Sequence, residues 1–438
     1  DYDAEEDEGG GRYGWKLMAA MVVAGVLVVG GGIAGVTSAL EAAEAGCRVI
    51  LVEKSPYLGG RVARTYRYFP KLCPPTCGLE INFRRIKDNP RIKVLTLSEV
   101  ESVSGDAGNY EVAVKVNPRY VNENCTCCNA CSEACQTEID SEYDFGMKKI
   151  KGAYLPFEMA FPARYVIAPD IIGTSDADRA KEACKYDAVD LEMEAKTLNL
   201  NVGAIVWSTG WQPYDAAKID NLGFGEYPNI ITNMMMERLA APNGPTQGKI
   251  LRPSDNKEPQ RVAFVQCAGS RDENHLPYCS YICCMASLKQ ATYVRERYPD
   301  AKIYIFYIDL RTPGYRYERF YEKIKEDENI FLIKGKVAEV SADSGSQNVT
   351  VVAENAVTGE KIHQEVEMVV LATGMQPTAA ADKLPADLQC NDDGFIINDF
   401  EKGGMFAAGC ANKPADVVSS NQNATGMALK AIQTLVSR

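Results

Sequence analysis

Fifteen cysteines, most of them in clusters, are the residues of this chain with the clearest chemistry. The first cluster reads Cys125-Thr-Cys-Cys128-Asn-Ala-Cys131-Ser-Glu-Ala-Cys135 and contains the C-x2-C-x2-C-x3-C spacing that binds a [4Fe–4S] cluster. No export signal is evident, so metal or redox use of the thiols is favoured over a disulfide framework. The only two histidines are His275 and His363, which disfavours a His-rich zinc site or a His-based hydrolase. The sequence therefore predicts iron–sulfur chemistry.

The fourth ligand of this cluster need not be the nearest cysteine. In two-cluster ferredoxins the last cysteine of each run ligates the other cluster, so Cys135 would serve a second site. Residues 171–189 resemble a ferredoxin second half that keeps only its final cysteine, Cys184. We therefore predict one [4Fe–4S] cluster bound by Cys125, Cys128, Cys131 and Cys184, with Cys127 as a spare thiol. The alternative, with Cys135 as the fourth ligand and Cys184 as a small buried side chain, stays open.

A second group of thiols consists of Cys267, Cys279, Cys283 and Cys284. The strand expected at 261–266 would enter a glycine turn in a pyridine-nucleotide domain, but here it enters Cys267-Ala-Gly-Ser, which argues against NAD(P)H binding. Cys279 and Cys283 are expected to lie one helical turn apart. On these residues alone, Cys283 and Cys284 fit a pair of buried helix thiols as well as a pair of ligands.

The element that must position a cofactor beside these thiols runs from Val26 to Glu53 as strand, glycine turn, helix and strand. Gly30, Gly32 and Gly35 occupy the G-x-G-x-x-G positions, which give a tight turn, close approach to a pyrophosphate and close helix packing. The helix N-terminus would face the phosphates, and Glu53 would accept hydrogen bonds from the ribose.

Later segments favour FAD over NAD as the cofactor. Residues 204–210 and 368–374 are apolar strands that end in Thr-Gly and resemble the strands that return to the flavin domain in two-dinucleotide-domain flavoproteins. Phe406-Ala-Ala-Gly409 precedes a helix expected from about Asn421, where a second helix end would meet the flavin's phosphate. Besides the glycine turn and Glu53, we expect FAD to contact Lys54, Gly60, Arg61, Val100, Thr209, Gly210, Gly374, Gly409 and Cys410.

Four segments, 264–272, 278–285, 307–311 and 408–411, resemble the A subunit of heterodisulfide reductase, and the similarity covers nearly everything after residue 20. The resemblance implies that Cys267, Cys279, Cys283 and Cys284 hold an unusual [4Fe–4S] cluster beside the flavin. It also implies that Lys289 approaches the flavin N5, where a positive charge would stabilise the reduced flavin. The expected cofactors are therefore FAD and two [4Fe–4S] clusters.

Within this family, the chain resembles most the A subunit of the quinone-interacting membrane-bound oxidoreductase complex of sulfate reducers. Residues 68–80 are similar to that subunit, and the chain is expected to lack the extra N-terminal domain and the second full ferredoxin cluster of the heterodisulfide reductase subunit. The resemblance implies electron transfer between the menaquinone pool and adenylylsulfate (APS) reductase, with B and C subunits as partners and the C subunit in the membrane. It implies a cytoplasmic location on the inner face of the membrane. A cytosolic, bifurcating heterodisulfide-reductase-like flavoprotein, a flavin-dependent NAD(P)H oxidoreductase and a scaffold with an inert FAD are the alternatives. Cys73 and Cys77 could form a redox pair or be structural loop thiols.

Length and charge fit a multidomain enzyme. The 438 residues predict two or three domains, and a net charge of −12 with a pI near 5.0 disfavours nucleic acid or an anionic membrane surface as a partner. No apolar run is long enough to span a bilayer. We predict an α/β fold, a Rossmann-like FAD-binding protein similar to thioredoxin reductase with a ferredoxin-like insertion. The expected parts are a disordered leader or expression tail (1–20), a discontinuous FAD domain (21–116, 199–260 and 371–438), the [4Fe–4S] insert (117–198) and a degenerate nucleotide-binding domain (261–370).

Overall fold

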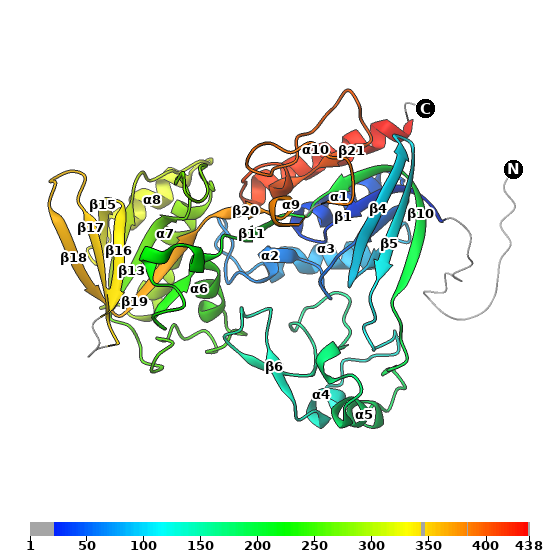
Figure 1. The fold of residues 1–438 in the computed structure, drawn as a ribbon, viewed down its shortest axis with the longest axis horizontal. Coiled ribbons are helices and arrows are strands. Elements are labelled where there is room, and N and C mark those ends of the chain that lie inside the picture. The colour runs from blue at the N-terminus through cyan, green and yellow to red at the C-terminus, as the bar shows by residue number, and fades with distance from the viewer. Residues whose placement is uncertain (1–21, 343–346, 383, 437–438) are drawn as a thin grey trace, which may run out of the picture.

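The computed structural model describes residues 22–342, 347–382 and 384–436, and they form three parts (Figure 1). We call residues 22–116, 196–213, 375–382 and 384–436 the first domain, residues 117–195 the insert, and residues 214–342 and 347–374 the second domain. The two domains are linked by the antiparallel pair β11 (Trp211–Pro213) and β20 (Met375–Pro377). The leader predicted at residues 1–20 lies outside the described residues.

The first domain is built on a seven-stranded sheet in the order β3-β2-β1-β10-β5-β4, with β21 beside β10. Its strands are β1 (Val22–Val29), β2 (Val49–Val52), β3 (Ile92–Leu95), β4 (Ser98–Asp106), β5 (Asn109–Val116), β10 (Lys196–Trp207) and β21 (Met405–Ala407). Strands β1, β2, β3 and β21 run parallel to their neighbours, and the apolar runs of β1 and β2 are buried on both faces. One face carries α1 (Ile33–Glu44), α3 (Thr76–Asp88) and α10 (Val417–Val436), whose alanine, leucine and phenylalanine side chains fill a common core. Short helices α2 (Gly60–Ala63), α9 (Thr378–Ala381) and η4 (Gly409–Ala411) complete this domain.

The second domain has a five-stranded parallel sheet in the order β12-β19-β13-β14-β15. These strands are β12 (Ile230–Thr232), β13 (Arg261–Ala268), β14 (Lys302–Tyr307), β15 (Ile330–Lys334) and β19 (Met368–Thr373). Helices α6 (Asn233–Ala240), α7 (Cys283–Arg297) and α8 (Tyr317–Lys325) pack on one face. The other face packs on the antiparallel sheet β16 (Val337–Ala342), β17 (Val349–Glu354) and β18 (Lys361–Val366), and on the turns η2 (Ala216–Lys218) and η3 (Asp220–Leu222).

The insert has a small core of its own beside the first cysteine cluster. It contains α4 (Ala130–Ala134), the hairpin β6 (Glu138–Asp140) and β7 (Lys149–Lys151), the pair β8 (Ala153–Tyr154) and β9 (Val166–Ile167), η1 (Pro169–Ile171) and α5 (Ser175–Glu182). Figure 1 shows β6 on the side of the insert that faces α6.

Several boundaries differ between the sequence-based expectation and the structure. The sequence assigns residues 199–260 to the FAD domain, but β12 and α6 belong to the second domain, because β12 pairs with β19. For the same reason residues 368–374 do not return to the first sheet. Strand β10 begins at Lys196, before the expected end of the insert, and α10 begins at Val417 rather than near Asn421. Within the described residues, we find no helix that combines the length and apolarity needed to cross a bilayer.

Candidate functional site

The glycine turn between β1 and α1 is closed by backbone contacts that leave no room for side chains. Gly30 has φ of +105°, and a Cβ atom there would lie 2.3 Å from the Ser208 carbonyl oxygen. A Cβ at Gly35 would lie 1.8 Å from the Gly30 carbonyl oxygen. Glycine is therefore required at both positions, for the turn at Gly30 and for the close approach of α1 at Gly35.

Gly32 differs because the space beside it is open. It precedes α1 with φ of −71°, and the nearest atom to an added Cβ would be the Gly60 Cα at 4.0 Å. The hydroxyls of Ser208 and Thr209, at the nearby end of β10, are buried without a hydrogen-bond partner in the described chain. An open space at a helix N-terminus fits a diphosphate. The residues present thus fit the phosphate portion of FAD.

Other predicted FAD contacts lie at different distances from this cradle. Gly60 and Gly409 border it, since a Cβ at Gly60 would lie 2.9 Å from the Gly32 Cα and one at Gly409 2.7 Å from the Ala34 Cβ. Lys54 points to solvent and pairs with Glu99 at 3.7 Å, so the structure does not bring it to the turn.

Two further predicted contacts also lie away from the cradle. Val100 packs against the far face of the first sheet, away from α1. Gly374 lies against Ser270 and Ser280 in the second domain, because a Cβ there would be 2.5 Å from the Ser270 Oγ.

Glu53 follows β2 as predicted, but its carboxylate already has partners on the backbone. Its Oε2 accepts a hydrogen bond from the Gly31 N–H at 2.5 Å, and its Oε1 accepts one from the Ser55 N–H at 2.7 Å. Burial raises the pKa of Glu53, and these two hydrogen bonds oppose that rise. The carboxylate therefore orders the glycine turn here, and a ribose would have to share it.

A cavity opens between the two domains next to the start of α1. From the first domain it is lined by Ile33, Arg61, Trp211 and Cys410 among others, and from the second by Asn233, Glu237, Met285, Lys289 and Tyr317. The Arg61 guanidinium lies 5.9 Å from the centre of the Trp211 ring, and its Nε donates to the Trp211 carbonyl at 3.2 Å. Burial lowers the pKa of Arg61 to about 10, with the Arg64 charge adding to the shift. This cavity extends from the start of α1 to α7, and its mostly apolar lining with a few polar side chains is typical of a cofactor site.

Lys289 lies in this cavity with a partner that the sequence did not reveal. Its Nζ pairs with the Glu237 Oε1 at 2.9 Å and donates to the Arg67 carbonyl at 2.6 Å. The side chains of Lys289 and Glu237 are 6% and 2% exposed. Glu237 also accepts hydrogen bonds from the Gln290 Nε2, the Tyr293 hydroxyl and the Tyr66 N–H. A fully hydrogen-bonded carboxylate thus holds one ammonium at the cavity wall.

The first group of thiols gathers in the insert. Burial and then the nearby thiols Cys125, Cys184 and Cys128 raise the pKa of Cys131 to about 12. Cys135 faces away from this group, with its thiol 3.8 Å from the Asp176 carbonyl. Cys184 therefore lies with the three upstream thiols, whereas Cys135 packs against α5.

Cys127 also lies at this group of thiols. Burial and then Cys125 raise the pKa of Cys127 to about 11. Its position next to Cys125 does not distinguish a spare thiol from a ligand, so its assignment as a spare thiol stays a prediction.

The second group of thiols gathers where β13 ends and α7 begins. Burial and then Cys267, Cys284 and Cys279 raise the pKa of Cys283 well above its usual value. Cys267 has φ of +56°, which interrupts the regular path of β13 just before its last residue, Ala268. Helix α7 starts at Cys283, so Cys279 lies in the loop before it. The spacing predicts that the two thiols lie one turn apart on the same helix, and that prediction was wrong. All four predicted thiols are brought together.

Neither group of thiols forms a site for a single metal ion within the described residues. No three His, Cys, Asp or Glu side chains within the described residues surround one point closely enough to hold a metal ion. In a cubane each thiolate binds a different corner iron, so its ligands lie further apart than those of one ion. Thiolates are the usual protein ligands of iron–sulfur clusters.

Tyr68 connects the cavity to another pair of cysteines. It lines the cavity, and burial followed by a hydrogen bond with Cys73 raises its pKa to about 12. Cys77 also lies near this phenol and is exposed.

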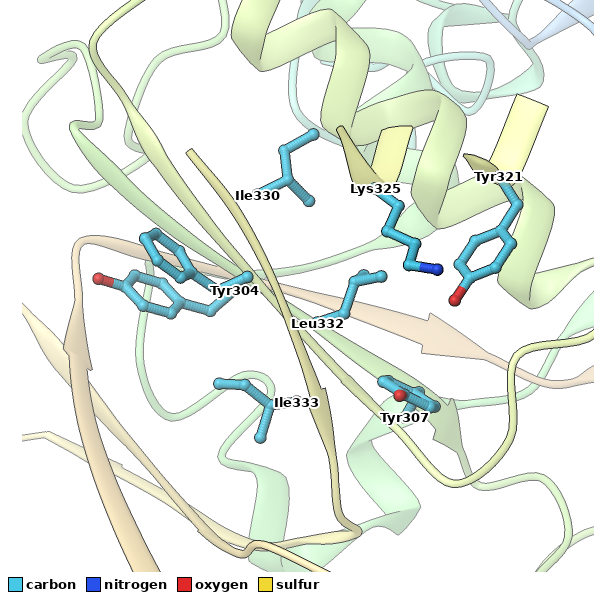
Figure 2. A pocket seen from close by; sticks show the side chains of 8 residues that line it. Tyr304, Tyr307, Tyr321, Lys325, Ile330, Leu332 and Ile333 are labelled. Carbon is cyan, nitrogen blue, oxygen red and sulfur yellow. The ribbon is translucent and has the colours of Figure 1, made fainter. Parts of the chain in front are cut away.

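A second, shallower groove lies along the outer edge of the parallel sheet and is drawn in Figure 2. It is lined by Tyr304, Tyr307, Tyr321, Lys325 and the side chains of Ile330–Ile333 on β15. Its lining contains no thiol and no glycine turn, so it lacks the groups expected to hold a flavin or an iron–sulfur cluster.

Comparison with known proteins agrees with this site. Residues 25–73 match a family of FAD-dependent oxidoreductases. The chain is 38% identical over 423 residues to an iron-sulfur A subunit of CoB–CoM heterodisulfide reductase from Methanopyrus kandleri, covering 94% of this chain and 64% of that protein. It is 36% identical over 417 residues to the iron-sulfur A subunit of the same enzyme from Methanocaldococcus jannaschii, covering 92% of this chain and 63% of that protein. The chain therefore spans less than two thirds of the length of these relatives.

Two solved structures share the fold. The thioredoxin reductases of Lactococcus lactis and T. acidophilum superpose with TM-scores of 0.52 and 0.51 at 13% and 15% identity. Each comparison covers 95% of this chain, and 100% and 98% of the solved chains. The predicted α/β fold is confirmed. The family match and the reductase relatives also support two other predictions, that the cofactor is FAD and that the protein is an oxidoreductase.

Proposed function

We propose that this chain is the electron-transfer component of a multi-subunit oxidoreductase similar to heterodisulfide reductase, and that it carries FAD and two [4Fe–4S] clusters. The observation that carries the proposal is the grouping of four thiols in the insert and four at the start of α7, with the glycine cradle and the interdomain cavity in the same chain. FAD exchanges two electrons and can pass them singly, while each cluster accepts one.

The protein's own residues would do three things in this relay. The glycines of the turn give close backbone approach to the diphosphate, and α1 directs its N-terminus at it. Lys289, held by Glu237, places a positive charge at the cavity wall, where it would favour negative charge on the bound ring system. The two thiol groups would supply the cluster ligands Cys125, Cys128, Cys131 and Cys184, and Cys267, Cys279, Cys283 and Cys284.

The partners separate two versions of this function. The relatives favour a complex of the heterodisulfide reductase type. The segment Tyr68–Glu80, with Cys73-Pro-Pro-Thr-Cys77, favours the quinone-interacting complex, in which the chain would join B and C subunits and connect menaquinone with APS reductase at the inner face of the cytoplasmic membrane. Isolation of the native complex under anaerobic conditions distinguishes them. A haem-bearing membrane partner that menaquinol reduces supports the second version, and a partner that reduces disulfides supports the first.

Cys184→Ser is expected to remove one cluster, while Cys135→Ser is expected to keep it. Cys184 lies with Cys125, Cys128 and Cys131, whereas the Cys135 thiol faces the Asp176 carbonyl. Iron, acid-labile sulfide and FAD measured on anaerobically purified protein should give about eight irons in the wild type and about four in Cys184→Ser. Cys47→Ser, just after α1, is the control and should keep all the iron. Iron loss in Cys135→Ser instead would move the fourth ligand to Cys135.

Cys279→Ser is expected to remove the other cluster and leave the first intact. Its thiol joins Cys267, Cys283 and Cys284, and a serine oxygen is a poor replacement for a thiolate on iron. About four irons should remain, and the double variant with Cys184→Ser should hold nearly none. The exposed Cys390, replaced by serine, is the matched control. A wild-type iron content in Cys279→Ser would argue against a cluster at this position.

A further inference from the structure

The tip of the β6–β7 hairpin, residues 141–148, leaves the insert and lies between the two domains (Figure 1). The Tyr143 ring belongs to the hydrophobic core of the first domain, where it packs edge-on against Tyr57 with ring centres 5.7 Å apart. Met147 packs against the helix-covered core of the second domain. One short hairpin thus reaches both domains that border the cavity.

The contact with the second domain is a buried ion pair. The Arg238 Nε lies 2.8 Å from the Asp144 Oδ1, and the two side chains are 1% and 5% exposed. The remaining guanidinium nitrogens donate to the Arg64 carbonyl and the Asn243 Oδ1, and the Asp144 Oδ2 accepts from the Ser141 hydroxyl at 3.0 Å. A buried pair persists only where its geometry and its other hydrogen bonds are satisfied, which makes this contact specific to one docking position.

The contact with the first domain lies beside the cavity. The Tyr143 hydroxyl donates to the Ala63 carbonyl at 2.5 Å, at the end of α2. Arg64 donates to the Tyr57 hydroxyl at 2.8 Å and pairs with Glu142 at 3.0 Å. The same short helix carries Arg61, which lines the cavity.

Helix α6 joins the hairpin to the cavity from the other side. Arg238, which holds Asp144, directly follows Glu237, which holds Lys289. Both residues are almost fully buried, so the position of the hairpin and that of the Lys289 ammonium are fixed by one turn of one helix.

We propose that the β6–β7 hairpin helps to fix the thiols of the insert relative to the interdomain cavity, with Asp144 and Arg238 as positioning residues for electron transfer. This inference rests on the proposed function, since it concerns the transfer of one electron from reduced FAD to the oxidised cluster of the insert, with no bond made or broken. The rate of such a transfer falls steeply with distance. A hairpin held in both domains keeps that distance constant.

The test compares Asp144→Asn with Asp140→Asn. Asp140 lies on the same hairpin, but its pair with Lys149 is solvent-exposed, so its loss should change little. In Asp144→Asn the isosteric amide leaves Arg238 buried without its counter-charge. We expect unchanged FAD and iron contents, unchanged reduction potentials, and amide hydrogen exchange in the insert faster by about tenfold. Cluster reduction after rapid reduction of the flavin, followed by freeze-quench EPR, should be about tenfold slower or more.

Several outcomes are decisive. Faster exchange with unchanged cluster reduction would overturn the positioning role and leave a purely structural ion pair. If Asp144→Asn does not fold, Tyr143→Phe replaces it, because this substitution removes only the hydrogen bond from the hydroxyl to Ala63. Tyr143→Phe should show faster amide exchange and slower electron transfer, and wild-type values of both would overturn the proposal. If the wild-type insert holds no iron, the proposed function fails. The exchange measurement still decides whether the hairpin holds the insert, and equal exchange rates in the Asp144 and Asp140 variants would overturn that role.

Discussion

Gly32→Ala is expected to give a folded protein that has lost most of its affinity for FAD. An added methyl group meets no protein atom closer than 4.0 Å, and the φ of −71° at Gly32 suits alanine. The methyl group would instead occupy the cradle in front of α1, where a diphosphate must approach the backbone. We expect the affinity for FAD to fall about tenfold or more, which is ~1.4 kcal/mol. FAD titration followed by flavin fluorescence measures the affinity, and circular dichroism checks the fold.

Gly35→Ala tests the same turn for a different reason. Its Cβ would lie 1.8 Å from the Gly30 carbonyl oxygen, so α1 must move away from the turn. A loss of about 3 kcal/mol or more of unfolding free energy is expected, even without FAD. Gly426→Ala on α10 is the matched control, because nothing lies within 4 Å of its added Cβ, and alanine there should stabilise the helix by ~0.5–1 kcal/mol. For the Gly32→Ala variant, an FAD affinity equal to that of the wild type would mean that the diphosphate binds away from Gly32.

Much of the first domain could be predicted because its information is local. The strand, turn and helix between Val26 and Glu53 lie within 28 residues, and their glycine spacing has a direct steric meaning. The predicted start of α10 was wrong although a signal was present. Asp416 accepts a hydrogen bond from the Ser419 N–H at 2.7 Å and so caps the helix, four to five residues before the expected start at Asn421.

The predicted domain boundaries were wrong where strand pairing is long-range. Strand β12 is only three residues long, and its partner β19 lies more than 130 residues away, so neither its pattern nor its length indicates which sheet it joins. The position of Cys184 near the upstream thiols could be predicted because its spacing follows a known motif, and its role as a ligand stays a prediction. Glu237 could not, since its role depends on how α6 packs against α7, and a single Glu in a methionine-rich helix has no distinctive neighbours.

Lys289→Met is expected to destabilise the protein even when FAD is absent. The substitution leaves the Glu237 carboxylate 2% exposed and without its counter-charge, with hydrogen bonds only from Gln290, Tyr293 and Tyr66. Removing one partner of a buried pair costs about 3–5 kcal/mol of unfolding free energy. Urea unfolding of FAD-free protein measures this loss. Lys325→Met, which breaks an exposed pair with Glu322 on α8, should cost less than about 1 kcal/mol.

The double variant Lys289→Met with Glu237→Gln separates the structural role of the lysine from its effect on the flavin. Because a neutral amide needs no counter-charge, the double variant should recover about 1–3 kcal/mol relative to the sum of the single losses. The positive charge at the cavity wall is still missing, so the midpoint potential of the bound FAD should stay below that of the wild type in both variants. Recovery of stability and of potential together would mean that Lys289 acts only through packing. A low potential in a stabilised double variant is the result expected if the ammonium itself favours reduced FAD.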